Sequence, residues 1–208
     1  MVEKDDVRRG YDGVAEAYAA ERGFDGQEQA VFEQFCDSLP TTACVLDAGC
    51  GQGRPILSRL VTETDGISVG VDLSGEQLQL ALQNAPDALL AQGDMTRLPL
   101  ADATLDGVIA FHSLIHIPEA EHQQAISEFA RVLRPEGYLL VSEGIGEWEG
   151  TNPDWLDTGV EMQWHIAGAD ATRQQLHEAG FRIEREWEAS DNLGDASGTW
   201  TFFLAQLD

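Results

Sequence analysis

The stretch VLDAGCGQGR at residues 45–54 decides the fold of this chain. An apolar run over 44–46 predicts a short strand that ends at Asp47, and glycines follow at alternate positions, 49, 51 and 53. Glycine adopts positive φ without strain, and its missing side chain lets a ligand approach the main chain closely. A helix is predicted next, over 55–63. A strand that runs through glycines into a helix is typical of nucleotide-binding α/β folds.

Outward from this stretch, predicted strands and helices alternate. Apolar runs predict further strands, and apolar residues spaced three and four apart predict helices. The strands are 67–71, 89–91, 106–111 and 137–141, and the helices are 6–21, 27–38, 74–84, 119–132 and 170–179. Such alternation indicates βαβ units and a mainly parallel sheet covered on both faces.

Two segments depart from this rhythm. Strands at 181–188 and 199–206, joined by the short polar link 189–198, predict an antiparallel hairpin at one edge of the sheet. The stretch 144–169 bears glycines and tryptophans, and we interpret it as a long loop. Loops of that length in a compact domain are usually functional.

Acidic residues stand at the ends of three successive strands. Asp47 ends the first strand, Asp72 the second and Asp94 the third. Asp72 lies where a carboxylate accepts hydrogen bonds from ribose hydroxyls in such folds. Asp94, with Met95 behind it, could bind an adenine amino group and pack against the ring. Each acid alone is more often a cap or turn residue, but three in this order are hard to obtain as unrelated features.

Charge argues against several classes of partner. The chain has 37 acidic and 12 basic residues, a formal net charge of −25, and Lys4 is its only lysine. Such a field repels phosphate backbones and anionic lipid, so we expect neither a nucleic-acid nor a membrane-surface partner. The acid-rich, lysine-poor composition resembles that of proteins from extreme halophiles, and we expect stability to rise with salt.

Length and composition favour one soluble domain. The 208 residues are 43% hydrophobic, enough for a full core. No apolar run reaches the roughly 18 residues of a membrane span, and the first residues lack a signal-peptide core, so we expect a cytoplasmic protein. Cys36, Cys44 and Cys50 lack the spacing of a zinc site or a disulfide framework, and we expect no metal.

In these motifs the chain resembles the class I S-adenosylmethionine-dependent methyltransferases. Besides VLDAGCGQGR, the matching segments are YDGVAEAYAAER at 11–22, VGVDLS at 69–74, AQGDMTRLPL at 91–100, ATLDGVIAFHSLIHI at 103–117, ARVLRPEGYLLVS at 130–142 and HEAGF at 177–181. The resemblance implies an α/β, Rossmann-like, doubly wound sheet of seven strands, mainly parallel with an antiparallel C-terminal hairpin and helices on both faces. It also implies one domain over 1–208, with 1–40 as a helical lid and 144–169 as a substrate region.

The resemblance further implies S-adenosyl-L-methionine as the cofactor. In that family the residue matching Asp72 holds both ribose hydroxyls, and the one matching Leu73 packs on the adenine. Asp94 with Met95 would recognise the adenine edge. The other implied cofactor-binding residues lie toward the methionine part and the sulfonium: Tyr11, Tyr18, Asp47, Gly49, Cys50, Gly51, Phe111, His112 and Ser113.

Candidates for acid–base chemistry and for acceptor binding are histidines and tryptophans. A general base is needed only if the acceptor must first lose a proton. His112, His116 and His165 are the candidate bases, with packing of the cofactor wall or local capping as the alternative for the first two. Trp148, Trp164 and His165 suit an apolar or aromatic small molecule, although the tryptophans could equally pack a lid onto the sheet. His122 and His177 are predicted surface residues.

Methyl transfer to an oxygen or nitrogen of a small molecule is therefore the expected function. Two alternatives stay open. One is a protein that binds the cofactor without catalysis, as a regulatory or partner subunit. The other is an NAD(P)-dependent oxidoreductase, which fits less well because its GxGxxG fingerprint has the third glycine one residue later, where this chain has Arg54. The acceptor atom and the oligomeric state are left open.

Overall fold

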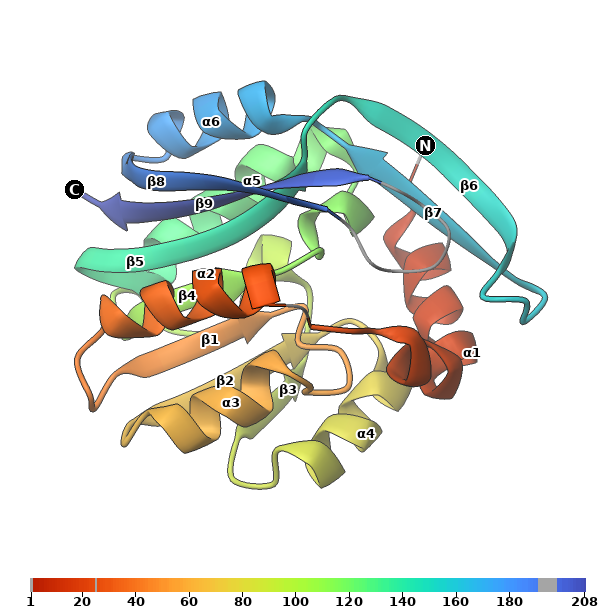
Figure 1. Ribbon diagram of the computed structural model, residues 1–208, viewed down its shortest axis with the longest axis horizontal. Coiled ribbons are helices and arrows are strands. Elements are labelled where there is room, and N and C mark those ends of the chain that lie inside the picture. Colours follow the sequence, from red (N-terminus) through yellow and green to blue (C-terminus); the bar gives the residue numbers. More distant parts are fainter. Residues whose placement is uncertain (1, 25, 191–197) are drawn as a thin grey trace.

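One mostly parallel sheet carries the fold (Figure 1), and the structure, a computed structural model, describes residues 2–24, 26–190 and 198–208. Its strands are β1 (Cys44–Ala48), β2 (Ile67–Asp72), β3 (Leu89–Gln92), β4 (Leu105–Ala110), β5 (Leu133–Gly144), β8 (Phe181–Ser190) and β9 (Thr199–Leu207). They lie in the order β3-β2-β1-β4-β5-β9-β8. The chain therefore proceeds from β1 first toward one edge and then, from β4, toward the other.

Strand pairing confirms the predicted fold class. The first five strands pair in parallel, whereas β9 runs antiparallel to both β5 and β8. Strand β5 begins earlier than predicted because Leu133 already pairs with Leu105, before a register shift. Of the polar link predicted within the last hairpin, residues 191–197 lie outside the described residues.

Helices cover both faces of the sheet. They are α1 (Lys4–Glu21), α2 (Gly26–Asp37), α3 (Ile56–Glu63), α4 (Gly75–Asn84), α5 (Glu119–Val132) and α6 (Ala169–Glu178), with 3₁₀ turns η1 (Met95–Arg97) and η2 (Leu114–His116). On one face, α5 and α6 bury Phe129 and Leu176. On the other, α2 and α3 bury Phe35 and Leu60, and α4 packs beside α3. No helix in these described ranges combines the length and apolar composition needed to cross a membrane.

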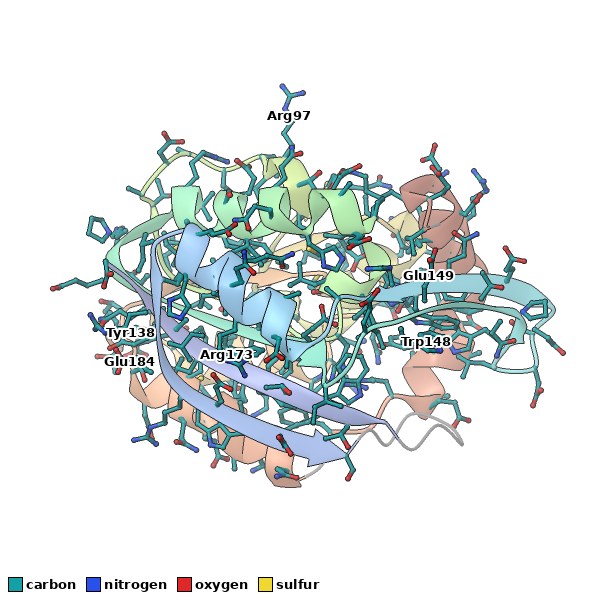
Figure 2. The ribbon with its side chains drawn as sticks, turned by 90° about the horizontal axis from the view of Figure 1, so that it is seen from above. Arg97, Tyr138, Trp148, Glu149, Arg173 and Glu184 are labelled. Carbon is teal, nitrogen blue, oxygen red and sulfur yellow. The ribbon has the colours of Figure 1, made fainter. Side chains whose placement is uncertain are left out.

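The stretch 144–169 is not the loop that the sequence predicted. It forms a two-stranded antiparallel arm, β6 (Trp148–Trp155) and β7 (Val160–Ile166). The arm follows the carboxyl end of β5, at the opposite end of the molecule from Tyr138 and Glu184 (Figure 2). The prediction missed these strands because β6 contains Gly150 and Pro153, residues that are depleted in strands.

Helix α1 packs against this arm rather than against the sheet. Val7 and Val14 form a small separate core with Trp155 and Met162. The fit is close at Gly10, where a Cβ would lie 2.8 Å from the Met162 side chain. The segment 1–40 thus divides into two parts. Helix α1 packs in the separate core beside the arm, whereas α2 packs in the core that covers one face of the sheet.

Candidate active site

Two cavities meet beyond the carboxyl ends of β1, β2 and β4. Strand order reverses between β1 and β4, the position at which open α/β sheets bind their ligands. The first cavity is lined by the residues that the sequence assigned to the cofactor: Tyr11, Tyr18, Asp47, Gly49, Cys50, Gly51, Asp72, Leu73, Asp94, Met95, Phe111, His112 and Ser113. The structure brings them all to the lining of one cavity, and their contacts with a cofactor stay predictions.

The glycine loop needs glycine for a steric reason. Gly49 has φ +81°, and a Cβ on it would lie 2.4 Å from the Ser113 Cβ. The Gly49 N–H donates to the Val71 carbonyl at 2.8 Å, and the Ser113 hydroxyl donates to the Ala48 carbonyl at 2.9 Å. These bonds hold the loop after β1 against the ends of β2 and β4.

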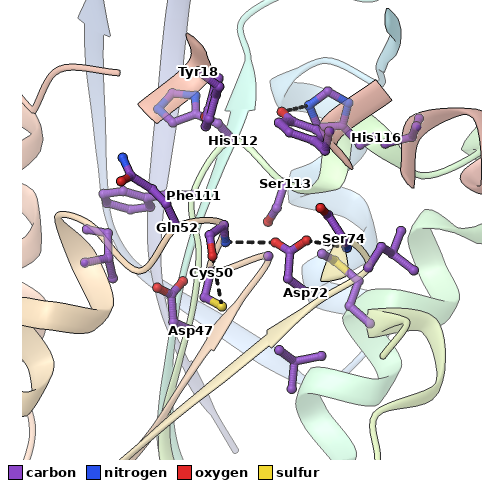
Figure 3. Close-up of a pocket in the computed structure, with 18 of the residues that line it drawn as sticks. Tyr18, Asp47, Cys50, Gln52, Asp72, Ser74, Phe111, His112, Ser113 and His116 are labelled. Atoms are coloured by element: carbon purple, nitrogen blue, oxygen red, sulfur yellow. Dashed lines mark hydrogen bonds between the residues drawn. The ribbon is translucent and has the colours of Figure 1, made fainter. Parts of the chain in front are cut away.

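Asp72 is held by backbone donors at the floor of the first cavity (Figure 3). Its Oδ2 accepts from the Gly51 N–H and its Oδ1 from the Ser74 N–H, each at 2.8 Å. Burial raises the pKa of Asp72 to about 6, against the opposing effect of these hydrogen bonds. Ser74 in turn caps α4 by accepting from the Gln77 N–H.

A second buried carboxyl, Asp47, stands beside Asp72. Burial, with the nearby charge of Asp72 as the second cause, raises the pKa of Asp47 to about 8. The Asp47 side chain is therefore mostly protonated at neutral pH. Two acids with raised pKa in one cavity suit a ligand that brings positive charge or hydrogen-bond donors.

Asp94 is fixed by an ion pair that sequence reasoning did not find. Its Oδ2 lies 2.5 Å from the Lys4 ammonium, which also lies 2.5 Å from the Glu121 carboxylate. Its Oδ1 accepts from the Thr96 N–H at 2.8 Å. Burial, the largest single effect, raises the pKa of Asp94, but the hydrogen bonds from Lys4 and Thr96 together with the Lys4 charge outweigh it, so the pKa is lowered. The single lysine thus ties α1 to the loop after β3.

The loop after β4 places His112 under backbone strain. Its φ is +51°, a region that costs a non-glycine residue about 1–3 kcal/mol and is concentrated at functional sites. The His112 N–H donates to the Ser142 hydroxyl at 2.7 Å, and its Nε2 lies 2.7 Å from Glu28 Oε1. Arg22 contacts the same carboxylate oxygen at 3.0 Å. Sequence reasoning missed Glu28, because one acid on a predicted helix gives no signal.

The second cavity has a volume of about 810 Å³, and four tryptophans and two tyrosines are among its lining residues. The predicted acceptor residues Trp148 and Trp164 line it, together with Trp155 of the same tryptophan-bearing stretch and with Trp200, which the sequence did not single out. Arg22 and four of the predicted residues line both cavities: Tyr11, Tyr18, His112 and His116. The two histidines lie across the first cavity from Asp47 and Asp72 (Figure 3).

His165 lines neither cavity, so the predicted acceptor contact is wrong. Side chains alternate along a strand, and Trp164 and Ile166 face the second cavity. His165 faces the other way, with its ring 5.6 Å from that of His122. His122 is fully buried rather than at the surface, and its Nε2 lies 3.0 Å from the Ile117 carbonyl. His177 is exposed, as predicted.

The chain is similar in sequence to known methyltransferases. Residues 46–141 match a family model described as a methyltransferase domain. The chain is 31% identical over 153 residues to an O-methyltransferase of Pyrenophora dematioidea, in an alignment that covers 67% of this chain and 54% of the relative. It thus spans about half the length of that relative.

A second sequence relative acts on a tRNA, and a solved structure shares the fold. The chain is 30% identical over 152 residues to a tRNA (carboxymethyluridine(34)-5-O)-methyltransferase of Arabidopsis thaliana, with 73% of this chain and 35% of the relative covered. A solved S-adenosylmethionine-dependent methyltransferase from Methanosarcina mazei superposes with a TM-score of 0.71 at 20% identity, over 82% of this chain and 95% of that one, and shows the fold. The chain therefore contains a methyltransferase domain, and its fold is that of solved S-adenosylmethionine-dependent methyltransferases.

Proposed function

We propose that this chain transfers a methyl group from S-adenosylmethionine to an oxygen of a small, largely apolar or aromatic molecule. The observation that carries the proposal is the meeting of the two cavities. The first has the acids expected to bind an adenosine, the second has aromatic walls, and His112 and His116 stand in the wall of both. A cofactor in one and an acceptor in the other would meet beside these side chains.

The first cavity fits the cofactor chemically. Asp72 would accept from the ribose hydroxyls and Asp94 from the adenine amino group, since both residues line the cavity. Asp47 would lie toward the cationic methionine part, where a positive charge favours its ionised form. Tyr11, Tyr18 and Phe111 would face the sulfonium with aromatic rings, an arrangement that attracts cations.

The second cavity favours a small molecule over a nucleic acid. Its tryptophans offer flat apolar surface, and Arg22 is the one cation among its lining residues. The net charge of −25 also repels a phosphate backbone. One relative nevertheless acts on a tRNA, so RNA belongs among the acceptors to be tested.

The protein's main contribution to the reaction would be to orient the reacting groups and to exclude water from them. The bound cofactor supplies the methyl group as a sulfonium. Holding the two reactants in line provides about 7–11 kcal/mol of the barrier. Helix α1 contributes Tyr11 and Tyr18 to both cavities and the arm contributes Trp164 to the second, and these rings would limit the access of water to the reacting groups. His112 and His116 are the candidates to accept a proton from the acceptor.

Incubation with S-adenosylmethionine and a panel of acceptors tests the proposal. The panel holds phenols, aliphatic alcohols, amines, thiols and bulk tRNA, and S-adenosylhomocysteine is quantified by mass spectrometry. We expect production with phenols or alcohols, and none with Asp72→Ala at the same cofactor concentration. Cofactor binding without turnover across the panel would favour the alternative of a non-catalytic binding protein, and turnover with tRNA only would refute the small-molecule acceptor.

A further inference from the structure

A chain of hydrogen bonds links the arm, the loop after β4 and the lid helix. His116 Nδ1 lies 3.2 Å from the backbone carbonyl of Gln163 on β7. His116 Nε2 lies 2.8 Å from the Tyr11 hydroxyl on α1. Tyr11 and His116 line both cavities, so this chain crosses the boundary between them.

The geometry fixes which atom carries each proton. A carbonyl oxygen accepts hydrogen bonds and never donates them, so the Gln163 carbonyl requires the proton of His116 on Nδ1. Burial lowers the pKa of His116 to about 4, so the ring is neutral at physiological pH and Nε2 is a lone-pair acceptor. The Tyr11 hydroxyl therefore donates to Nε2. The Tyr11 oxygen has two lone pairs, so beside the Tyr18 hydroxyl, which interacts with it, one lone pair can accept a proton from a third group.

We propose that Tyr11 relays the proton of the acceptor's hydroxyl to His116 during methyl transfer. The inference rests on the proposed function. The acceptor oxygen forms a bond to the methyl carbon, and the carbon–sulfur bond breaks with its electron pair remaining on sulfur. The acceptor's proton passes to the Tyr11 oxygen, and the proton of Tyr11 passes to His116 Nε2. His116 becomes an imidazolium, and its Nδ1–H stays on the Gln163 carbonyl.

Charge balance explains how a buried histidine can take this proton. Burial disfavours a cationic His116 because it adds an uncompensated charge to a dry site. In the reaction the positive charge on sulfur disappears as the imidazolium forms, so the net charge of the site does not change. Once the product leaves, burial again favours the neutral ring, and the proton returns to water.

The surroundings favour His116 over His112 as the end of this relay. His112 contacts the Glu28 carboxylate through Nε2, and its ring packs edge-on to Trp200 with centroids 4.4 Å apart. The ionisable groups that act on the relay pair are Tyr18 and Arg22 from the α1 side, Asp72 at the end of β2, and His112 itself. Burial raises the pKa of Tyr11, which keeps the hydroxyl protonated between turnovers.

A series of phenols with graded acidity tests the relay. Phenols whose pKa lies well above the assay pH must lose a proton in the reaction, whereas nitrophenols that are already ionised need no base. We expect Tyr11→Phe to lower kcat/KM about 10²-fold for the weakly acidic phenols, the lower end of the usual effect of general-base catalysis. For the ionised phenols we expect a change within about threefold, because the ring of Tyr11 is retained. His116→Asn should show the same contrast.

Three comparisons keep the result interpretable. Tyr18→Phe removes the other tyrosine hydroxyl of both cavities and should change all phenols by the same factor. Cofactor affinity and the circular dichroism spectrum of each variant separate binding and folding from chemistry. The double variant of Tyr11 and His116 should be no slower than the slower single variant, since both act in one relay.

Two results refute the relay. One is an equal loss on ionised and un-ionised phenols in Tyr11→Phe, which indicates a packing role, and the other is a double variant whose loss is the product of the single losses. If the wild-type protein methylates neither phenols nor alcohols, the proposed function fails on its own account. Turnover by the wild type with unchanged selectivity in Tyr11→Phe rejects the relay and leaves the proposed function standing.

Discussion

Cofactor binding should release a proton from Asp47. Its carboxyl is buried, and its pKa of about 8 leaves it mostly protonated at pH 7. A cationic ligand at about 4–6 Å lowers the pKa of a carboxyl by about 1–3 units. If the pKa falls by about two units on binding, about 0.8 proton is released per cofactor at pH 7. Affinity then rises about fivefold from pH 6 to 7 and about fivefold again from pH 7 to 8.

Titration calorimetry measures this release directly. The enthalpy of binding S-adenosylhomocysteine is compared at pH 7 in phosphate and in Tris, whose ionisation enthalpies differ, and the difference gives the number of protons. Asp47→Asn should abolish most of the release. Glu143→Gln is the matched control, because Glu143 is fully buried, also has a pKa raised by burial to about 8, and lines neither cavity.

The outcomes separate clearly. Release of most of a proton by the wild type and by Glu143→Gln, but not by Asp47→Asn, agrees with the reasoning. Equal binding enthalpies in the two buffers for the wild type would show that Asp47 does not ionise when the ligand binds, and the placement of the cationic part beside it would be wrong.

Three further predictions concern stability and helix α1. The Tm should be higher in 1 M KCl than in 0.1 M KCl. The Debye length falls from about 10 Å to about 3 Å, so the added salt screens the self-repulsion of a net charge of −25. An unchanged or lower Tm contradicts this prediction. Glu143 has a folded-state pKa raised to about 8, so its contribution to stability is complete below about pH 4.5 and is lost as pH rises to 8, by at most about 1.4 kcal/mol per pH unit. Denaturant unfolding should therefore show Glu143→Gln gaining on the wild type across this range, and parallel pH profiles argue against it. Deleting residues 1–22 should weaken cofactor binding at least tenfold, because it removes Tyr11 and Tyr18 from the lining of the first cavity. A tenfold loss is roughly the loss of one hydrogen bond to a charged group. Unaltered affinity of a folded variant would show that α1 only packs against the arm.

The residues that line the first cavity could be predicted because the patterns that indicate them are local in sequence. The glycines at 49, 51 and 53 follow a short apolar strand, and Asp72 and Asp94 end the next two. Parallel strands bring their carboxyl ends to one edge, so these residues had to meet once the alternation of strands and helices was recognised.

The lining of the second cavity could not be predicted in the same way, because packing between segments far apart in sequence determines which side chains line it. The arm was missed as strands, and with it the alternation that turns His165 away from Trp164. Glu28 reaches His112 from a helix far away in sequence, and Lys4 reaches Asp94 in the same way. His122 has polar neighbours in sequence, yet the packing of α5 buries it.

A crystal structure of the complex with S-adenosylhomocysteine tests the central claim most directly. We expect the ribose hydroxyls on the Asp72 carboxylate, the adenine amino group on Asp94, and the sulfur facing the boundary that Tyr11 and His116 share with the second cavity. A ligand bound elsewhere, or one whose sulfur points away from the aromatic cavity, would contradict the account.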